Sequence, residues 1–292
     1  MSLFDRRTPA APGNEWNGTP SDFYGYVCYE FPLDRCVARV VEPRNPLPGR
    51  PWVWRTMFWD SFPIADVAFL KAGLYVAYIE VGNTFGCPDA MKYFDVFYAF
   101  MTAEHGMAKR PALEGLSRGG LYAYRWAHVN TDKVGCLYGD APVCDMKSWP
   151  GGKGIGAGSV DDWRTAIECY HFSGEQEMLD FTGNPIDTLA PLAAADIPII
   201  HVTGDSDGAV PQTENTDVAR ERYLMLGGRF VLIVKQGCDH HPHGLNDPTP
   251  VVNYILAHTA GGQAAEDAAP LAPPPGTVIT LTPEEWQREG VA

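Results

Sequence analysis

The chain has 292 residues, which is enough for one large α/β domain with a sizeable core or for two small domains. Its 36 acidic and 22 basic side chains give a formal net charge of -14 at pH 7, which disfavours nucleic acid and anionic lipid headgroups as partners. No apolar run approaches the roughly 20 residues that cross a bilayer, so we expect a soluble protein without a membrane partner.

The N-terminal residues and the cysteines leave the compartment open. The first residues, MSLFDRR, lack the apolar stretch of a signal peptide. The seven cysteines include no C-x-x-C pair, and an odd number cannot all pair within one chain. The localisation is therefore unknown from the sequence: the protein is either cytoplasmic or exported with its leader removed.

The predicted elements begin after a loose N-terminal arm at residues 1–23, which is rich in Pro, Gly, Asn and Thr. Two β-rich runs at 24–31 and 36–42 are joined by a Pro-Leu-Asp-Arg hairpin signal, and a third strand is expected at 52–59. Strands and helices then alternate. Further strands are predicted at 74–81, 111–116, 134–140, 197–204 and 229–235, and helices at 63–72, 90–107, 119–128, 213–226 and 251–258.

This alternation predicts an α/β fold with an eight-stranded, mostly parallel sheet and helices on both faces. The early hairpin adds antiparallel strands at one edge. Residues 144–190 interrupt the rhythm with a Gly-rich stretch and short helices, which indicates a small cap insertion after the sixth strand. The main domain is therefore expected at 24–260, and residues 261–292 are interpreted as an Ala/Pro linker with a short C-terminal tail.

Residues 115–119, GLSRG, fit the pattern G-x-S-x-G in a strand–turn–helix setting. An apolar predicted strand precedes Ser117, and a helix that starts at Gly119 follows it. Such a nucleophile elbow needs small neighbours because the serine lies in a strained turn, and Gly115, Gly119 and Gly120 meet that need. The setting predicts that Ser117 is a nucleophile whose hydroxyl projects at the carboxyl edge of the sheet, over the positive end of the helix.

Two further polar segments follow the last two predicted strands. Residues 204–211, GDSDGAVP, come after the seventh strand, and residues 237–243, GCDHHPH, come after the eighth. Both segments lie just beyond strand C-termini, where the sites of open α/β sheets gather. An acid and then a histidine therefore follow Ser117 along the chain, which is the order that belongs with this type of elbow.

With these motifs the chain resembles the α/β-hydrolase family over the whole predicted main domain. In that family a G-x-x-D-x-x-V-P segment carries the acid and a G-x-x-H segment carries the base, which correspond here to Asp207 and His240. The resemblance implies that Ser117 attacks the substrate, that His240 transfers the proton and that Asp207 orients the histidine. It also implies two oxyanion N–H donors, which we assign to Arg118 and to the loop near Trp59.

Two assignments inside the site have an alternative. Asp140 closes the sixth predicted strand, and some members of the family carry the acid on that strand, so Asp140 is the alternative acid. Arg118 gives the elbow a similarity to that of glucuronoyl esterases, where an arginine helps to polarise the reacting carbonyl. The other interpretation of Arg118 is an ion-paired surface arginine.

The histidines after the last strand also invite a metal interpretation. His241 and His243 follow His240 closely, but Pro242 disrupts regular ligand spacing and no second cluster of ligands is present in the sequence. The Gly-rich stretch at 151–159 does not fit the phosphate-binding pattern G-x-x-x-x-G-K-[ST]. The sequence therefore predicts no metal and no cofactor.

The cap and the family branch suggest the substrate class. The branch that the chain resembles is that of acetyl xylan esterases, dienelactone hydrolases and prolyl-oligopeptidase-like enzymes. Because the cap is polar rather than continuously apolar, long-chain lipids are disfavoured. Trp149, Trp163 and His241 are the predicted substrate contacts, since aromatic rings suit sugars or an aromatic acyl group. The first hypothesis is a serine esterase for a short-acyl or carbohydrate ester, with the oligomeric state open. The alternatives are a non-catalytic binding module of the same fold and a peptidase or thioesterase.

Overall fold

The structure is a computed structural model that describes residues 15–288. The first fourteen residues of the expected arm and the last four residues of the tail, 289–292, lie outside the described residues. Among the described residues, no helix has the length and apolarity that a bilayer crossing requires.

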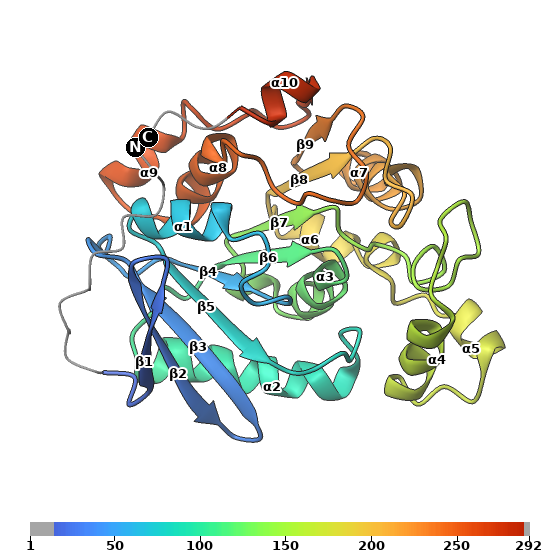
Figure 1. Cartoon of the computed structure of the whole chain (residues 1–292), viewed down its shortest axis with the longest axis horizontal. Coiled ribbons are helices and arrows are strands. Elements are labelled where there is room, and N and C mark those ends of the chain that lie inside the picture. Colours follow the sequence, from blue (N-terminus) through green and yellow to red (C-terminus); the bar gives the residue numbers. More distant parts are fainter. Residues whose placement is uncertain (1–14, 289–292) are drawn as a thin grey trace.

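One sheet of ten strands runs through the molecule in the order β1-β2-β3-β5-β4-β6-β7-β8-β9-β10 (Figure 1). Strands β1, β2 and β3 form antiparallel pairs up to β5, and every pair from β5 to β10 is parallel. The expected fold class is confirmed. The strands are β1 (Thr19–Phe23), β2 (Tyr26–Leu33), β3 (Cys36–Glu42), β4 (Trp52–Arg55), β5 (Tyr75–Glu80), β6 (Ala112–Leu116), β7 (Cys136–Asp140), β8 (Ile199–Gly204), β9 (Phe230–Lys235) and β10 (Val278–Leu281).

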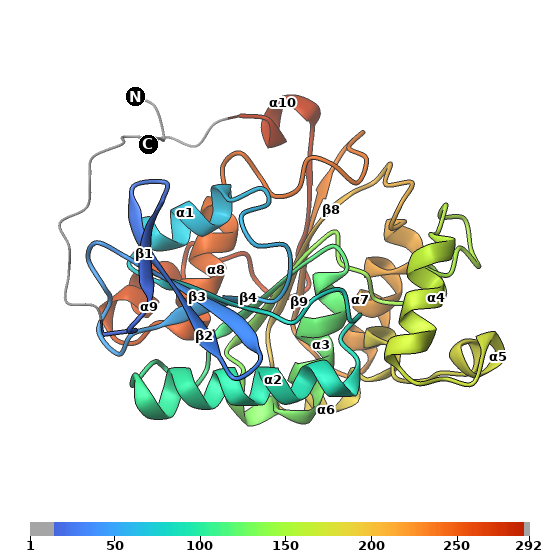
Figure 2. The ribbon, with the colours of Figure 1, turned by 60° about the horizontal axis from the view of Figure 1, so that its bottom comes forward.

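Helices cover both faces of this sheet (Figure 2). Helices α1 (Ile64–Lys71) and α8 (Thr249–Thr259) pack on one face, and the larger group packs on the other. That group comprises α2 (Pro88–Ala99), α3 (Gly119–Val129), α6 (Ala190–Ala194) and α7 (Thr216–Met225), with a π-helical turn at Phe100–Glu104 and 3-10 turns at Thr131–Lys133, Pro185–Asp187 and Gln212–Glu214.

Strand β4 illustrates why the core has two halves. Successive side chains of a strand point to opposite faces, so Val53 packs in the core half beneath α1 and α8. Trp54 points to the other half, where its ring lies 4.8 Å from that of Phe94 in α2 and 4.9 Å from that of Trp126 in α3. All four residues of β4 are buried, as expected for a strand covered on both faces.

Two edge strands account for the difference from the eight predicted. The first, β1, falls in the expected N-terminal arm, and four of its five residues are exposed, so it carries no apolar pattern. The second, β10, falls in the expected linker and tail and pairs with β9. It is preceded by α9 (Gln263–Ala268) and followed by α10 (Pro283–Trp286), which begins with a capping box between Thr282 and Glu285. Edge strands of this kind are held by backbone hydrogen bonds, and hydrophobic periodicity in the sequence does not predict such bonds.

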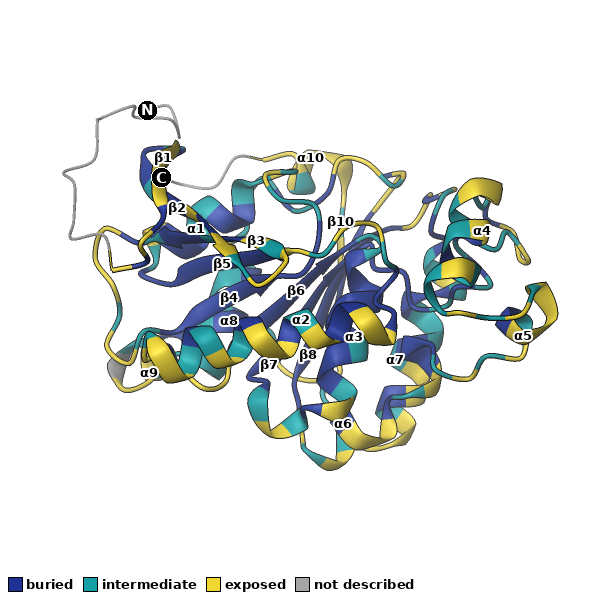
Figure 3. Ribbon diagram, turned by 90° about the horizontal axis from the view of Figure 1, so that it is seen from below, coloured by how far each residue is buried: buried dark blue, intermediate teal, exposed yellow. Residues whose placement is uncertain are grey.

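The cap insertion leaves the sheet after β7, the sixth of the predicted strands. It contains α4 (Val160–Cys169) and α5 (Glu175–Leu179), which project beyond the sheet (Figures 1 and 2). In Figure 3 the central strands β4, β6, β7, β8 and β9 are buried throughout, whereas the outward faces of α4 and α5 are exposed. The cap therefore lies over one end of the parallel strands.

Candidate active site

Ser117 lies in a tight turn between β6 and α3. Its φ is 51°, in the left-handed region that non-glycine residues seldom adopt. A Cβ on Gly115 would lie 2.9 Å from Gly120 Cα, and one on Gly120 would lie 2.8 Å from the Val143 carbonyl oxygen. These glycines are therefore required by close approach, and the turn has the form of the predicted nucleophile elbow.

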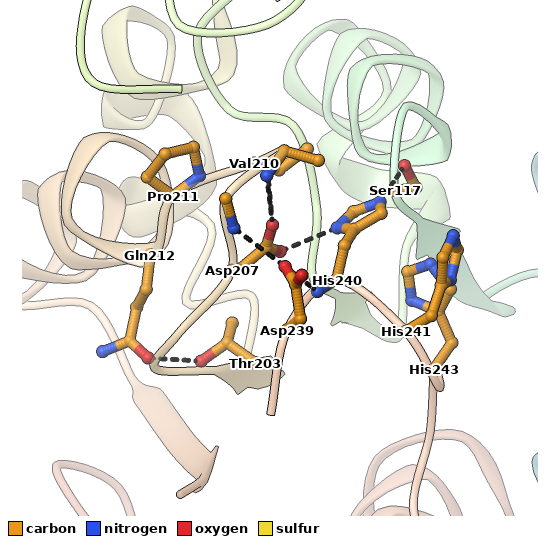
Figure 4. Close-up of polar contacts among 12 residues, drawn as sticks. Ser117, Thr203, Asp207, Val210, Pro211, Gln212, Asp239, His240, His241 and His243 are labelled. Atoms are coloured by element: carbon orange, nitrogen blue, oxygen red, sulfur yellow. Dashed lines mark hydrogen bonds and ion pairs between the residues drawn. The ribbon is translucent and has the colours of Figure 1, made fainter. Parts of the chain in front are cut away.

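The three residues of the predicted triad form one hydrogen-bonded chain (Figure 4). Ser117 Oγ lies 2.9 Å from His240 Nε2, and His240 Nδ1 lies 2.7 Å from Asp207 Oδ2. Because Nδ1–H donates to the carboxylate, the Nε2 lone pair is left to accept the hydroxyl proton of the serine. Both distances fall in the range for proton transfer between a nucleophile, a base and its orienting acid.

The acid is held firmly by its own loop. Asp207 Oδ1 accepts hydrogen bonds from the backbone N–H groups of Ala209 at 2.9 Å and Val210 at 2.7 Å. The side chain of Asp207 is 1% exposed, while that of His240 is 12% exposed. The carboxylate is thus fixed in the protein interior, with one oxygen for the backbone and the other for the histidine.

Two further aspartates tie the acid loop to the histidine loop, and the sequence analysis assigned neither to the site. Asp239 Oδ1 accepts from the backbone N–H of Gly208 at 2.9 Å and of His240 at 2.7 Å. These two backbone hydrogen bonds lower the pKa of Asp239. Asp205 Oδ1 accepts from the N–H of Gly237 at 2.7 Å. In the sequence these two aspartates are marked only by their position next to Asp207 and His240. That position alone does not distinguish an aspartate that joins the two loops from one that forms a turn.

The alternative acid, Asp140, contacts a different histidine. Its Oδ1 lies 2.9 Å from His243 Nδ1, and its Oδ2 accepts a hydrogen bond of 2.8 Å from the Tyr138 hydroxyl. Burial would raise the pKa of Asp140, but the contact with His243, the charge of Lys235 and the Tyr138 hydroxyl outweigh it and lower the pKa to about 2. The position beside His240 belongs to Asp207, so Asp140 does not serve as the acid of this histidine.

The three histidines of the last loop come together. One ring nitrogen from each of His240, His241 and His243 lies within 4.8 Å of the others. His243 is buried, whereas His241 is exposed and stacks on the ring of Phe62 at 5.4 Å. Pro242, which argued against regular ligand spacing in the sequence, does not keep the rings apart.

Arg118 is an ion-paired residue held by the cap. Its Nη1 lies 3.1 Å from Asp162 Oδ1 in α4 and also donates to Asn83 Oδ1 in the loop after β5. The guanidinium lies 5.1–5.6 Å from the ring centres of Phe58, Phe85 and Trp149. Asn83, Asp162 and Phe85 were not predicted, because they come from separate segments that no local motif connects, and the loop that contains Phe58 was considered only for an oxyanion donor.

The loop after β4 packs against the start of α3, where the oxyanion donors were expected. Thr56 Oγ1 donates to the Gly119 carbonyl oxygen at 2.9 Å, and Met57 N would lie 3.8 Å from a Cβ on Gly119. The Trp59 ring packs away from this point, at 5.5 Å from Tyr78. The Trp59 side chain therefore lies outside this contact. The assignment of the second oxyanion donor to the backbone of this loop stays a prediction.

The predicted aromatic contacts differ in their surroundings. Trp149 is partly exposed and faces Arg118. Trp163 is 8% exposed and packs into the core of the cap, with Lys153 Nζ 5.6 Å from its ring centre. Little of the Trp163 ring is available to a substrate, because the indole fills the space beneath α4. His241 remains exposed beside His240.

No protein-family model matches the chain, and no curated protein sequence matches it. Solved structures do match. An S-formylglutathione hydrolase from Agrobacterium tumefaciens superposes with a TM-score of 0.55 at 14% identity, over 76% of this chain and 91% of that one. A puromycin hydrolase variant superposes with a TM-score of 0.60 at 14% identity, over 94% of this chain and 42% of that one.

An acylaminoacyl peptidase from Pyrococcus horikoshii also superposes, with a TM-score of 0.55 at 11% identity, over 77% of this chain and 38% of that one. This chain thus spans less than half the length of the puromycin hydrolase and of the peptidase, but most of the formylglutathione hydrolase. At such low identity these matches establish architecture alone. With the sheet order and the elbow, they show that the chain has the α/β-hydrolase fold.

Proposed function

We propose that the protein is a serine hydrolase that cleaves a carboxylic ester through an acyl-enzyme. The observation that carries this proposal is the unbroken chain of hydrogen bonds from Ser117 through His240 to Asp207. It begins on a strained serine and ends on a carboxylate held by backbone N–H groups. A fold alone does not specify chemistry, whereas this arrangement of nucleophile, base and acid does.

The steps follow from the atoms that face one another. Ser117 Oγ attacks the ester carbonyl as its proton passes to His240 Nε2, and a tetrahedral oxyanion forms. The imidazolium, stabilised by Asp207, then protonates the leaving alcohol as the C–O bond breaks. A water molecule then attacks the acyl carbon as its proton passes to His240. The bond to Ser117 Oγ breaks, His240 returns the proton to Ser117, and the acid is released. The base and its orienting group are in place before the substrate binds, so little reorganisation is needed.

The oxyanion needs donors that are fixed before the reaction. We assign the first to the backbone N–H of Arg118, at the start of α3, where the helix dipole also favours negative charge. The second belongs to the backbone of the loop after β4, which packs on the start of α3 at Thr56 and Met57. Both donors are main-chain groups, so side-chain substitution at Arg118 tests its guanidinium without removing the donor.

The surroundings of Ser117 support a polar substrate. Arg118, Asn83 and Asp162 form a polar cluster next to the nucleophile, and Trp149 borders the guanidinium. Such groups suit a short acyl chain or a sugar hydroxyl better than a long alkyl chain. We therefore favour a short-acyl or carbohydrate ester as substrate.

A peptidase is the second candidate, because an acylaminoacyl peptidase is among the superposed structures. The two functions are separated by hydrolysis of p-nitrophenyl acetate, butyrate and octanoate beside a set of aminoacyl p-nitroanilides. The ester proposal predicts activity that falls with chain length and is absent in Ser117→Ala. Ser173→Ala, which changes an exposed-loop serine of the cap, is the matched control. Faster cleavage of an anilide than of any ester would favour the peptidase.

A further inference from the structure

Three imidazoles meet beside the nucleophile, and the proposed hydrolysis uses one of them. Their ring nitrogens, one from each of His240, His241 and His243, lie within 4.8 Å of one another. Neutral imidazole is a ligand for zinc, copper and nickel, whereas calcium and magnesium select oxygen donors. The chemistry of this donor set therefore selects a borderline divalent cation.

His243 is the strongest indication of a ligand. Its Nδ1 is paired with Asp140 Oδ1 at 2.9 Å, which leaves Nε2 as the free ring nitrogen. The side chain is 1% exposed, and Nε2 is buried without a hydrogen-bond partner. A buried nitrogen without a partner costs free energy, and a metal ion would supply the missing interaction. A carboxylate behind the other nitrogen is the arrangement that orients metal-bound histidines.

The carboxylate is itself held in place. Asp140 Oδ2 accepts hydrogen bonds from the Tyr138 hydroxyl at 2.8 Å and from the Gly244 N–H at 2.6 Å. Each of these contacts restricts the orientation of Asp140, and through it the direction in which His243 presents Nε2. Such support is what a metal ligand requires from the residues behind it.

His240 has the same construction. Asp207 lies behind its Nδ1 at 2.7 Å, so its Nε2 also faces forward, toward Ser117 at 2.9 Å. The third histidine, His241, is exposed and stacks on Phe62, with its ring centre 4.9 Å from that of His243. Two histidines are thus fixed by carboxylates, and the third lies at the surface, where its side chain is free to adjust.

We propose that His240, His241 and His243 bind one zinc ion and that the bound ion switches off the nucleophile. The second half of this statement rests on the proposed function. The lone pair of His240 Nε2 that would take the proton of Ser117 is donated to the metal instead. The serine then keeps its proton, and no bond to the substrate carbonyl forms. No oxidation or reduction is involved, and water completes the coordination.

Zinc binding requires the three histidine ring nitrogens to move closer together. Zinc holds imidazole nitrogens at about 2.0–2.1 Å, so in a tetrahedral site they lie about 3.4 Å from one another. The ligand atoms lie within 4.8 Å of one another, and rotation of the exposed His241 side chain brings the third nitrogen inward. The net charge of -14 also favours accumulation of cations at the surface.

The site is tested first by binding, without reference to activity. Calorimetric titration of the full chain with zinc alone is expected to give one ion per chain, in wild type and in Ser117→Ala alike. His243→Ala and His241→Ala are each expected to weaken binding at least about tenfold. Because His241 is exposed, its variant reports on the site even where loss of the buried His243 side chain affects folding.

The matched control is another histidine with a carboxylate behind it. His171 is exposed, and its Nε2 lies 3.0 Å from Asp89 Oδ2, so His171→Ala removes a comparable pair outside the cluster. Binding is expected to be unchanged in this variant. Cobalt(II) spectra of the loaded chain are expected to lack the charge-transfer band that a thiolate gives and histidine does not, which would exclude the free cysteines as ligands. Equal zinc affinity in His241→Ala, His243→Ala and wild type would overturn the site, as would a thiolate band or the absence of a stoichiometric ion.

The effect on the nucleophile is measured by the rate at which a fluorophosphonate labels Ser117. Saturating zinc is expected to slow labelling at least about tenfold, a chelator is expected to restore it, and His241→Ala is expected to need more zinc. Undiminished labelling in the zinc-bound chain would overturn the inhibition. Absent labelling in metal-free protein would contradict the proposed hydrolase instead, and the binding titration would still decide the metal site.

Discussion

Asp207 Oδ2 lies 2.7 Å from His240 Nδ1, whereas Asp140 Oδ1, at the end of β7, lies 2.9 Å from His243 Nδ1. The two pairs are alike in form, since each places a buried carboxylate behind the Nδ1 atom of a histidine. Only the pair of Asp207 and His240 continues to Ser117. The geometry therefore separates two aspartates that sequence patterns leave as alternatives.

Substitution of the two aspartates is expected to separate them in solution. Asp207→Asn should lower kcat by about a thousandfold or more, because the amide no longer fixes the tautomer or stabilises the imidazolium of His240. Asp140→Asn should lower kcat far less, since it acts on His243. Steady-state ester hydrolysis by both variants measures this difference, and a larger loss of kcat in Asp140→Asn would reverse the assignment.

The clamp formed by Asp239 is expected to influence the rate through the positions of the two loops. Asp239→Ala removes the hydrogen bonds to Gly208 and His240, and we expect kcat to fall about tenfold because the acid and base loops lose their common anchor. Asp239→Asn keeps a carbonyl oxygen as acceptor and should retain most of the rate. Equal rates in both variants would show that the clamp does not position the site.

Arg118 is expected to affect substrate binding more than chemistry. Its guanidinium is paired with Asp162, and the proposed oxyanion donor is its backbone N–H, which every substitution except proline keeps. Arg118→Gln should therefore raise KM several-fold and leave kcat within about threefold of wild type. Asp162→Asn, which breaks the same ion pair from the cap, is the control. A fall in kcat of about a hundredfold in Arg118→Gln alone would place the guanidinium in the reaction itself.

A buried acid beneath the site is expected to make stability depend on pH. Arg55 Nη1 contacts Asp66 Oδ2 and lies 3.5 Å from Glu114 Oε1, and all three side chains are buried. Burial and the charge of Asp66 raise the pKa of Glu114 to about 8, although Arg55 opposes this. Glu114 thus keeps its proton in the folded protein at pH 7, while the unfolded chain releases it near pH 4.5. Because the folded pKa is the higher one, stability is lost as the pH rises between these values.

Glu114→Gln removes this loss of stability at rising pH, because glutamine carries no proton to release. We expect its free energy of unfolding to exceed that of wild type by up to about 3 kcal/mol at pH 7, and the gain to grow between pH 5.5 and pH 8. Urea unfolding of both proteins at these pH values measures the gain. A variant that is less stable than wild type at pH 8 would show that Glu114 is ionised and paired in the folded state.

The parts of the site that sequence could predict are those that local motifs encode. Ser117, Asp207 and His240 each lie in a short segment just after a buried strand, and parallel strands bring their carboxyl ends to one edge. The structure places all three in contact there. The sheet, its two faces and the position of the cap followed from the same alternation of strands and helices.

The parts that sequence could not predict depend on contacts between distant segments. Arg118 contacts Asn83 in the loop after β5 and Asp162 in α4, and no spacing of residues along the chain predicts these contacts. The pairing of Asp140 with His243 joins residues more than one hundred positions apart. Strand β10 was not predicted because its apolar run, VITL, has only four residues and follows an Ala/Pro-rich stretch, and its pairing with β9 is a contact between distant segments.

The central claim is that Ser117 becomes acylated, and the most direct measurement is mass spectrometry of the protein during a burst with p-nitrophenyl acetate. We expect one p-nitrophenol to be released per chain in the burst and an acetyl group on the peptide that contains Ser117. Both should be absent in Ser117→Ala and in His240→Ala. An acetyl group on another residue, or a burst that persists in Ser117→Ala, would contradict it.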